Sequence, residues 1–332
     1  TKHDKERYEH KYEYCDLLIT GSGPSGLASA YTAAKNGARV LLAEDKPRFG
    51  GSLLTSEVNI GNQSGREWAD NIIAELKQMP NVIVKNRAQV FGYYDHNMLV
   101  MSERISDHLP KSKKYSPKQR LWYIRAKEVV ISSGSIERPL VFGDNDTPGV
   151  MLSSAAKEYL KVYGVIVGKK PLIFTNNDSG YETAIEFKKN GIDAVILDTR
   201  KEPKSELVEE AKNLNINIKF SYVVINANGY KKVKSATIAN ISDDKKILSR
   251  IENIVCDCIC VSGFWTPTIH LASQSGANTK FNKNIDAFLP DKSKQKEVTV
   301  GSANGIYTLE ETLKTSFEVG SKLSKKITKN DN

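Results

Sequence analysis

Short apolar runs and helical segments alternate along this chain, which is the pattern of an α/β protein. The first clear unit starts at Cys15: residues 17–19 form an apolar run, a glycine-rich turn follows, and Leu27–Asn36 has the composition of a helix. Gly37 is a suitable C-terminal stop for that helix, and Arg39–Ala43 is predicted as the next strand. The pattern therefore predicts a strand, a turn, a helix and a second strand in succession.

The same succession returns in the middle of the chain. A strand, a turn, a helix and a second strand are predicted over 170–174, 175–180, 181–190 and 194–198. The chain therefore contains an internal repeat of the first unit. The second turn, TNNDSG, lacks the first two glycines of the first turn, and Asn176 and Asp178 place side chains where a phosphate would lie. We expect no dinucleotide in this second unit.

The remaining segments complete the two repeats. Further helices are predicted over 65–78, 153–163, 206–213 and 309–321. Further strands are predicted over 82–85, 87–94, 121–126, 128–132, 216–222, 232–239, 246–249, 253–263 and 297–300. The polar, basic segment 104–120 is expected to be a hairpin or loop.

The late return of an apolar strand and a glycine-containing loop at 297–305 indicates that the chain leaves its first domain and comes back to it. We expect a polar lead-in over 1–14, a first dinucleotide-binding domain over 15–148 plus 264–330, and an inserted second domain over 149–263. The predicted fold class is α/β, with two Rossmann-like dinucleotide-binding folds, the second inserted into the first. This is the glutathione-reductase-like architecture of FAD- and NAD(P)-binding disulfide reductases.

Composition narrows the possible partners. The 332 residues contain 48 Lys and Arg against 39 Asp and Glu, a formal charge of +9, but the lysines are scattered and no basic stripe with aromatic residues is present. We therefore expect no nucleic acid and a weak preference for anionic ligands or an acidic partner subunit. No apolar run of about 18 residues and no signal peptide are present, and four cysteines are too few for a disulfide scaffold. These features predict a cytoplasmic protein without a membrane segment.

The first turn carries the candidate cofactor chemistry. It matches G-x-G-x-x-G and consists of Gly21, Ser22, Gly23, Pro24, Ser25 and Gly26. Gly21 permits the tight turn, Gly23 lets a pyrophosphate approach the backbone, and Gly26 lets the helix pack on the strand. The N-terminal amides of that helix point at the phosphates. Glu44 ends the second strand, where its carboxylate accepts hydrogen bonds from a ribose, which favours NAD or FAD over NADP.

Other loops are expected to approach the same cofactor. Gly51 belongs to a pair of glycines that lets a loop pass close by, and Ser133 and Gly134 are small residues at the end of a strand. The helix over 309–321 is expected to add its N-terminal amides to the site.

The reaction machinery of the disulfide reductases is absent. No C-x-x-C pair occurs, and the three cysteines at 256, 258 and 260 alternate along an apolar strand, so we expect them to share one buried face. Their spacing is poor for zinc, and the five histidines are scattered without the order of a catalytic triad or a metal site. We predict no catalytic residue and no metal ligand in this chain.

Several stretches together resemble the α subunit of heterotetrameric sarcosine oxidase. They are ERYEHKYEYCDLLITGSGPSGL, RFGGSLL, FGYYDHN, RLWYIRAKEVVISSGSIERPLVFGDNDTPGVMLSSA, IFTNNDSGYETA and VSGFWTPTIHLASQSG. The resemblance covers nearly the whole chain. It implies a complex with β, γ and δ subunits that demethylates sarcosine with O2 to glycine, H2O2 and a one-carbon unit passed to tetrahydrofolate. It also implies an oxidising FAD on the β subunit, an FMN at the interface with that subunit, and a zinc on a small subunit.

The resemblance implies NAD in the first dinucleotide fold of the α subunit. The residues that match the NAD contacts of that family are Ser25, Glu44, Asp45, Lys46, Ser52, Val90, Ser302, Ala303 and Thr308. Flavoproteins of this class usually carry Gly-Asp after the returning strand, and here the pair is Gly301-Ser302, which favours NAD over FAD. The folate domain and the N-terminal domain of the family have no counterpart in this sequence, so we expect a fragment or a shortened relative.

Two other functions fit parts of the pattern. The first is a self-contained FAD oxidoreductase that uses NADH, which would need a nicotinamide site in the second repeat. The second is the α subunit of an opine or amino-acid dehydrogenase, which tends to carry cysteine clusters that this chain lacks.

Overall fold

The computed structural model describes residues 6–110, 116–244 and 246–330, and the side chains of all of these except 249–250 and 328–330. The chain divides into two compact units. Unit 1 comprises the residues up to Ser135 and those from Pro267 onward, and unit 2 comprises Ile136–Thr266. Unit 1 is thus formed by two separate parts of the chain.

Unit 1 is built on a parallel sheet with the strand order β5-β2-β1-β8, and β21 also pairs with β8. The strands are β1 (Tyr8–Thr20), β2 (Val40–Ala43), β5 (Val82–Lys85), β8 (Gln119–Ile131) and β21 (Glu297–Thr299). Leu18 of β1 lies opposite Leu41 of β2 and Val129 of β8. All three side chains are fully buried, because the sheet is covered on both faces, as is usual for parallel sheets.

An antiparallel meander continues this sheet. It consists of β6 (Ala88–Tyr94), β7 (Met98–Arg104) and the first half of β8. Residues 8–14, which we expected to be a lead-in, instead form the first half of β1 and pair in parallel with β8. The reason is the alternation of aromatic and charged residues in YEHKYEY, which is a strand period. Tyr12 stacks on Tyr123 of β8 with ring centroids 5.2 Å apart. Residues 1–5 lie outside the described residues.

The structure describes residues 104–110 and 116–120 of the segment that we expected to be a hairpin or loop. β7 ends at Arg104 and β8 starts at Gln119, while residues 111–115 lie outside the described residues. The two strands expected over 121–126 and 128–132 are one continuous strand, β8, which keeps the same register with β1 on both sides of Lys127.

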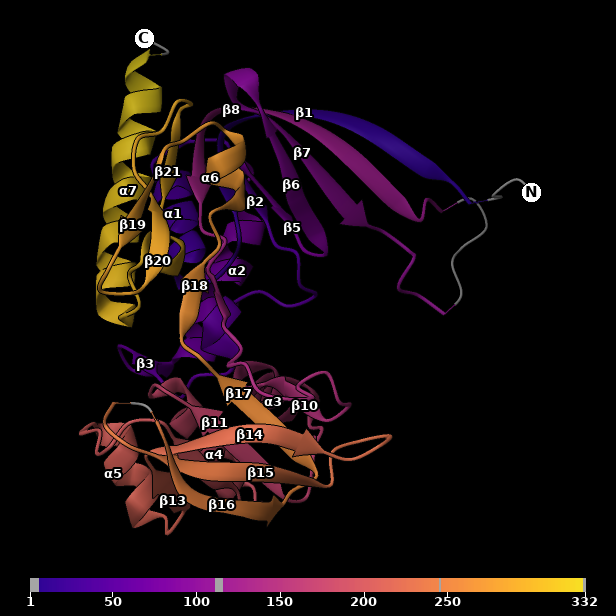
Figure 1. Cartoon of the computed structure of the whole chain (residues 1–332). Helices are drawn as coiled ribbons and strands as arrows, with labels where there is room; N and C mark the ends of the chain where they lie inside the picture. The colour runs from indigo at the N-terminus through magenta and orange to yellow at the C-terminus, as the bar shows by residue number, and fades with distance from the viewer. Residues whose placement is uncertain (1–5, 111–115, 245, 331–332) are drawn as a thin grey trace. The chain divides into compact units, whose positions relative to one another are not determined.

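Helices α1 (Pro24–Lys35) and α7 (Leu309–Asn330) lie side by side against the sheet of unit 1 (Figure 1). Their crossing uses small residues: Ser29 Oγ donates to the Ser316 carbonyl at 3.1 Å, and a Cβ on Gly320 would lie 2.6 Å from the Ser29 carbonyl oxygen. Helix α2 (Gly65–Gln78) begins with a capping box in which Ser64 and Glu67 satisfy each other's backbone amides.

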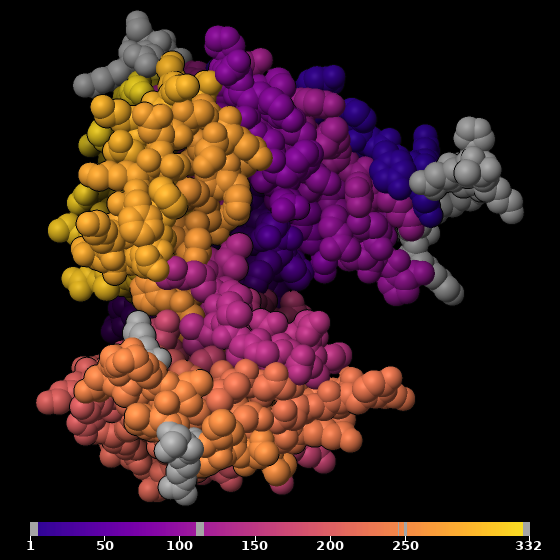
Figure 2. Space-filling view, in the orientation of Figure 1, coloured from indigo at the N-terminus to yellow at the C-terminus, as the bar shows by residue number. Residues whose placement is uncertain are grey.

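The part of unit 1 after Pro267 also contains elements that the sequence did not predict. They are helix α6 (His270–Gln274) and the hairpin β19 (Thr279–Asn282) and β20 (Ala287–Pro290). In Figure 2 this segment, in orange, forms a continuous part of the visible surface of unit 1. The remaining short elements of unit 1 are β3 (Asn59–Ile60), β4 (Gln63–Ser64) and the 3-10 turns η1 (Gly51–Leu54), η2 (Asp95–Asn97) and η3 (Gly301–Asn304).

Unit 2 repeats the parallel sheet with the strand order β10-β17-β11-β12-β13. Its strands are β10 (Val150–Leu152), β11 (Pro171–Thr175), β12 (Val195–Asp198), β13 (Asn217–Phe220) and β17 (Cys258–Ser262). Its helices are α3 (Ser153–Tyr163), α4 (Ser179–Lys189) and α5 (Glu206–Asn213). An antiparallel sheet is formed by β14 (Tyr222–Asn228), β15 (Ser235–Ile241) and β16 (Ile247–Val255). The short strands β9 (Ser135–Glu137) and β18 (Trp265–Pro267) pair where the chain passes from one unit to the other.

The three cysteines of unit 2 do not share one face, contrary to our expectation. Cys258 and Cys260 lie on β17 and face the core under α3 and α4, with their sulfurs 3.6 Å apart. Cys256 lies between β16 and β17 and packs in the other core, against the antiparallel sheet. The expected single strand over 253–263 is two strands, and the turn between them changes the side-chain parity. All four cysteines, including Cys15, are free and buried.

The fold class predicted from the sequence is confirmed, since each unit has the parallel sheet and the strand–turn–helix–strand order of a Rossmann-like fold. Within the described ranges, no helix combines the length and the apolar composition that crossing a membrane requires.

The α1–α7 crossing gives a first prediction. Replacing Gly320 with Val places a branched side chain against the Ser29 backbone, so we expect the free energy of unfolding to fall by about 1–3 kcal/mol in urea unfolding. Lys322→Val is the matched control, because it adds the same helix-disfavouring residue at an exposed position of α7. Equal destabilisation by both variants would show that the crossing tolerates the side chain.

Candidate functional site

The turn between β1 and α1 is shaped by two glycines. Gly21 has φ +107°, and a Cβ there would lie 2.4 Å from the Ser132 carbonyl oxygen. A Cβ on Gly26 would lie 1.9 Å from the Gly21 carbonyl oxygen. No real side chain tolerates either distance, so both positions require glycine for the backbone to close.

Gly23 differs from these two glycines. Its φ is −65°, and a Cβ there would meet nothing within 4 Å. The space above Gly23 is therefore open, and glycine is not required there by the fold itself.

This open space lies at the N-terminus of α1. The helix begins at Pro24 and has no side-chain cap. Among the described residues, the first amide of the helix that donates to a backbone carbonyl is that of Leu27, which donates to Gly23 at 3.0 Å. The amides of Ser25 and Gly26 and the positive end of the helix dipole remain for an anionic ligand. This arrangement suits a phosphate.

Glu44 is the buried acid of the site, with only 6% of its surface exposed. Its Oε2 accepts from the Ser22 amide at 2.8 Å and the Ser22 hydroxyl at 2.5 Å, and its Oε1 accepts from the Lys46 amide at 2.9 Å. The Gly50 amide in turn donates to the Ser22 carbonyl at 3.0 Å. These bonds join the glycine turn, the end of β2 and the loop before η1.

Burial raises the pKa of Glu44 to about 7, and a hydrogen bond shared with Asp45 acts in the same direction. The donors on Ser22 and Lys46 favour the ionised form and limit the rise. The carboxyl group therefore changes its charge near neutral pH.

Two loops converge on the turn. Gly51 has φ +54°, and a Cβ there would lie 2.7 Å from Cα of Gly23. Gly301 has φ +65°, and a Cβ there would lie 2.7 Å from Oγ of Ser25. Ser25 is buried against this returning loop, so its side chain helps to join α1 to η3. Ser52, next to Gly51, is exposed.

The end of β8 forms the opposite wall. Ser132 Oγ donates to the Thr20 and Gly21 carbonyls at 2.9 Å, and Ser133 Oγ donates to the Thr268 carbonyl at 2.7 Å. Gly134 has φ +75°, and a Cβ there would lie 3.9 Å from Oγ of Ser302. The structure thus brings the strand end after β8 beside the returning loop.

The other candidate residues lie at the margin of this arrangement. Asp45 and Lys46 are exposed after Glu44, and the Ala88 amide, two residues before Val90, donates to the Glu44 carbonyl at 2.8 Å. Val90 itself is half-buried in β6.

On the returning side, Ala303 is fully buried in η3. Thr308 is exposed just before α7, and its carbonyl accepts from the Thr312 amide at 3.1 Å.

Three residues of the site were not among those predicted. They are Ser132, which supports the turn from below, Gly50, which bonds to Ser22, and Gly301, which contacts Ser25. The glycine pair at 50–51 and the small-residue run at 132–135 were visible signals, but the partners of these residues are distant in the chain.

The corresponding turn of unit 2 satisfies its own polar groups. Asn177 Oδ1 accepts from the Ser179 amide at the start of α4, and Asn177 Nδ2 donates to the Ser262 carbonyl at 3.0 Å. Asp178 forms an ion pair with Arg200 at 2.8 Å. An amide and a carboxylate thus lie where the first unit offers free amides.

The acid at the end of β12 is also neutralised. Asp198 is fully buried and accepts from the backbone amide of Arg200 at 2.9 Å, from its guanidinium at 2.8 to 3.2 Å, and from the Tyr181 hydroxyl at 2.7 Å. A guanidinium therefore neutralises this acid, whereas the donors to Glu44 are two backbone amides and a hydroxyl.

Among the residues that the structure describes, no group of three or more His, Cys, Asp or Glu side chains is arranged to hold a metal ion.

A comparison with protein families matches residues 15–299 to the pyridine nucleotide-disulphide oxidoreductases. The match spans both units and includes the glycine turn, Glu44 and the returning strand. The chain belongs to the pyridine nucleotide-disulphide oxidoreductase family. It is thus an oxidoreductase by family, as the resemblance to sarcosine oxidase implied.

Individual relatives of known name are similar in sequence to this oxidoreductase over most of its length. Sarcosine oxidase subunit alpha of Rhizobium meliloti (strain 1021) is 38% identical over 308 residues, which is 90% of this chain and 29% of the relative. The same subunit of Corynebacterium sp. (strain P-1) is 33% identical, over 96% of this chain and 33% of the relative. These matches confirm the resemblance stated from the motifs. The chain spans a third or less of the length of these relatives.

Solved structures support the fold of this family. L-proline dehydrogenase from P. horikoshii has a TM-score of 0.71 at 19% identity, over 96% of this chain and 57% of that chain. Thioredoxin reductase of T. acidophilum has the same TM-score at 15% identity, over 94% of this chain and 98% of that chain. At these identities the likeness concerns the fold alone.

The glycines of the turn give a second prediction. We expect Gly26→Ala to lower the free energy of unfolding by at least about 2 kcal/mol, because its methyl group collides with the Gly21 carbonyl. Gly23→Ala is the matched control and should stay within about 0.5 kcal/mol of the wild type, since its methyl group enters open space. Urea unfolding measures both values. A loss of stability in Gly23→Ala as large as in Gly26→Ala would refute this description of the turn.

Proposed function

We propose that this chain is the NAD-binding part of the α subunit of a heterotetrameric sarcosine oxidase. The similarity to sarcosine oxidase subunit alpha over 90% or more of the chain supports the assignment. The complex would demethylate sarcosine oxidatively to glycine, H2O2 and a one-carbon unit passed to tetrahydrofolate. The β, γ and δ subunits would be its partners.

The observation that carries the cofactor assignment is the open space above Gly23 at the uncapped N-terminus of α1. The pyrophosphate of NAD would lie there, held by the amides of Ser25 and Gly26. Glu44, with Asp45 and Lys46 beside it, would hold the adenosine ribose, and Val90 would contact the adenine. The loops with Ser52, with Ser133 and Gly134, and with the returning residues would close the site.

We infer NAD and not FAD from the returning loop. The residue after Gly301 is Ser302, so the carboxylate that FAD enzymes of this class usually direct at the flavin side chain is missing. A Cβ on Gly134 would lie 3.9 Å from the Ser302 hydroxyl oxygen, so the end of β8 and the returning loop are close together at this point.

The catalytic flavins belong to partner chains in this proposal. No residue of this chain is assigned to the reaction itself, in keeping with the absence of a C-x-x-C pair. The FMN would lie at the interface with the β subunit, and electrons from sarcosine would reach it from the oxidising FAD. Unit 2 would bind no dinucleotide, because the polar groups of its turn already have partners within the protein. A cytoplasmic location, expected from the sequence, stays a prediction.

The first test is an absorbance spectrum of the purified protein with mass spectrometry of the cofactor that denaturation releases. We expect one NAD per chain and no flavin band near about 450 nm. Gly23→Ala should fold normally but lose at least about tenfold in NAD affinity, because its methyl group occupies the place of the pyrophosphate. Stoichiometric FAD that is bleached by NADH would instead identify a self-contained oxidoreductase.

The second test uses the titration of Glu44. Since its pKa is raised to about 7, the carboxylate that accepts from the ribose forms mainly between pH 6 and 8, and we expect NAD affinity to rise about tenfold over that interval. Calorimetry at several pH values measures it. Glu44→Gln cannot ionise, so its affinity should be weak and independent of pH. A wild-type profile as flat as that of Glu44→Gln would exclude Glu44 as the ribose ligand.

The same titration affects folding with the opposite sign. A raised pKa means that the folded chain binds this proton more tightly than the unfolded chain does. The contribution of Glu44 to stability is therefore complete below its ordinary value of 4.5 and is lost as the pH rises through about 7. Binding should be compared at pH values where the circular dichroism spectrum is unchanged.

A further inference from the structure

A surface hollow of about 520 Å³ lies between α2 and the loop 47–54 in unit 1. We call it the α2 hollow. Its floor is apolar: Phe49 is half-buried, and Leu54 and Ile73 are only 9% and 6% exposed. Its rim is charged and exposed, with Arg48 on the loop and Arg66, Asp70 and Lys77 on α2.

The charge of this rim is unbalanced. Three cations, Arg48, Arg66 and Lys77, face one carboxylate, Asp70. Within the described ranges, Arg48 and Arg66 form no ion pair, and Lys77 lies over the ring of Phe49 with its Nζ 5.4 Å from the centroid. Other cations of unit 1 do have carboxylate partners, as in the pairs Arg39–Asp16 and Lys326–Glu128. The α2 hollow therefore presents unneutralised positive charge around an apolar floor.

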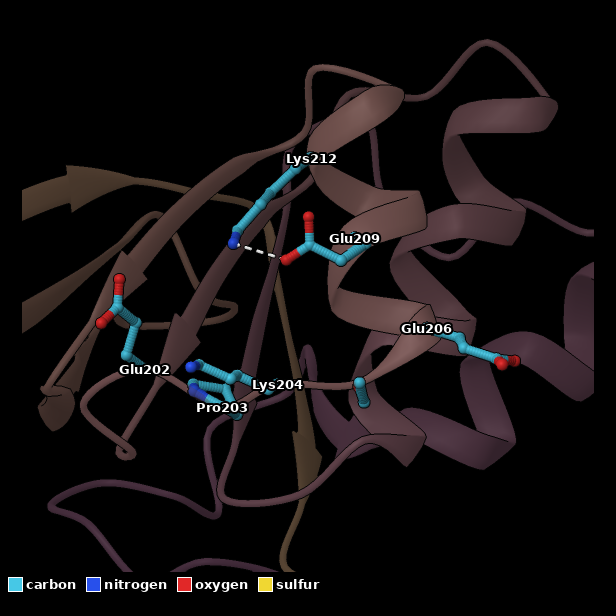
Figure 3. A pocket seen from close by; sticks show the side chains of 7 residues that line it. Glu202, Pro203, Lys204, Glu206, Glu209 and Lys212 are labelled. Atoms are coloured by element: carbon cyan, nitrogen blue, oxygen red, sulfur yellow. Dashed lines mark hydrogen bonds and ion pairs between the residues drawn. The ribbon is translucent and has the colours of Figure 1, made fainter.

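A second hollow, in unit 2, has a different charge balance (Figure 3). It measures about 540 Å³ and is lined by Glu202, Lys204, Glu206, Glu209 and Lys212 among others. Glu209 and Lys212 point toward each other and pair at 2.8 Å. Its three acids outnumber its two bases, so its excess charge is negative, opposite in sign to that of the α2 hollow.

The form of the α2 hollow suits a protein segment better than a small molecule. Small-molecule sites usually enclose most of the ligand surface, whereas this hollow is open to solvent and all its charged residues are exposed. An apolar centre with a polar rim is the usual composition of a protein interface. The excess of cations calls for carboxylates on the opposing surface.

We propose that the α2 hollow is the docking site for an acidic segment of the flavin-bearing partner subunit. An apolar side chain of the segment would lie on Phe49, Leu54 and Ile73, and its carboxylates would face Arg48 and Arg66. The inference rests on the proposed function, because that function supplies the partner.

The position of the hollow gives this docking a connection to the NAD site. Arg48 and Phe49 directly precede Gly50, whose amide donates to the Ser22 carbonyl of the glycine turn. A Cβ on Gly50 would lie within 3.3 Å of the side chains of Leu54 and Ala69, so this loop is tightly packed between the hollow and the turn. A segment bound in the hollow would therefore hold the loop that closes the dinucleotide site.

The experiment measures binding of this chain to the flavin-bearing subunit of the same enzyme by surface plasmon resonance. The charge-reversed variant Arg48→Glu/Arg66→Glu should bind at least about tenfold more weakly, associate more slowly and lose most of the dependence on NaCl concentration. The control variant Lys204→Glu/Lys231→Glu carries the same change in net charge on exposed residues of unit 2 and should bind within about twofold of the wild type.

The outcomes separate the two proposals. If wild type, variant and control bind alike, the docking site is wrong while the proposed function stands. If the wild type does not bind the subunit at all, the proposed function fails and the docking site fails with it. A third outcome is that citrate alone stabilises the wild type but not Arg48→Glu/Arg66→Glu, while both bind the subunit equally well. This result would identify a small-anion site and would also overturn the docking proposal.

Discussion

The close approach of Gly26 to the Gly21 carbonyl is the constraint on which unit 1 depends. Because no side chain lies between them, β1 can turn directly into α1, and the N-terminus of the helix points out of the turn. Ser132 holds the same turn from below through two carbonyls, and Glu44 holds it from the side through Ser22. The open space above Gly23 exists only because these contacts keep the backbone closed around it.

The two units show how one fold supports two different turn chemistries. In unit 1 no side chain caps the helix N-terminus by a hydrogen bond, so the free amides are available to an anion. In unit 2 Asn177 accepts from the first helical amide, and Arg200 neutralises both Asp178 and Asp198. The strand, the turn and the helix place the helix N-terminus in the same way in both units. The side chains at the turn decide whether its backbone amides are free to bind a ligand.

Much of the fold was predictable because its signals are local. The periods of helices such as α2, α3 and α5 and the apolar runs of β2 and β5 are properties of short segments. The errors occurred where the signal was mixed or the pairing distant. YEHKYEY was judged by its charge and not by its alternation, and the turn at Asp257 that separates Cys256 from Cys258 carries no glycine or proline. The hairpin β19–β20 and helix α6 are too short to show a clear period.

The sequence by itself determined the glycine turn, the acid after the second strand, the repeat and the family resemblance, because steric freedom at a glycine and residue spacing are encoded within a few positions. Only the tertiary structure decided that Glu44 bonds to Ser22, that Gly301 contacts Ser25, and that Arg48 joins the face of α2. These contacts join residues that lie between 18 and 276 positions apart, and no local pattern records such a distance. The burial that raises the pKa of Glu44 arises in the same way, from elements that meet only in the folded unit.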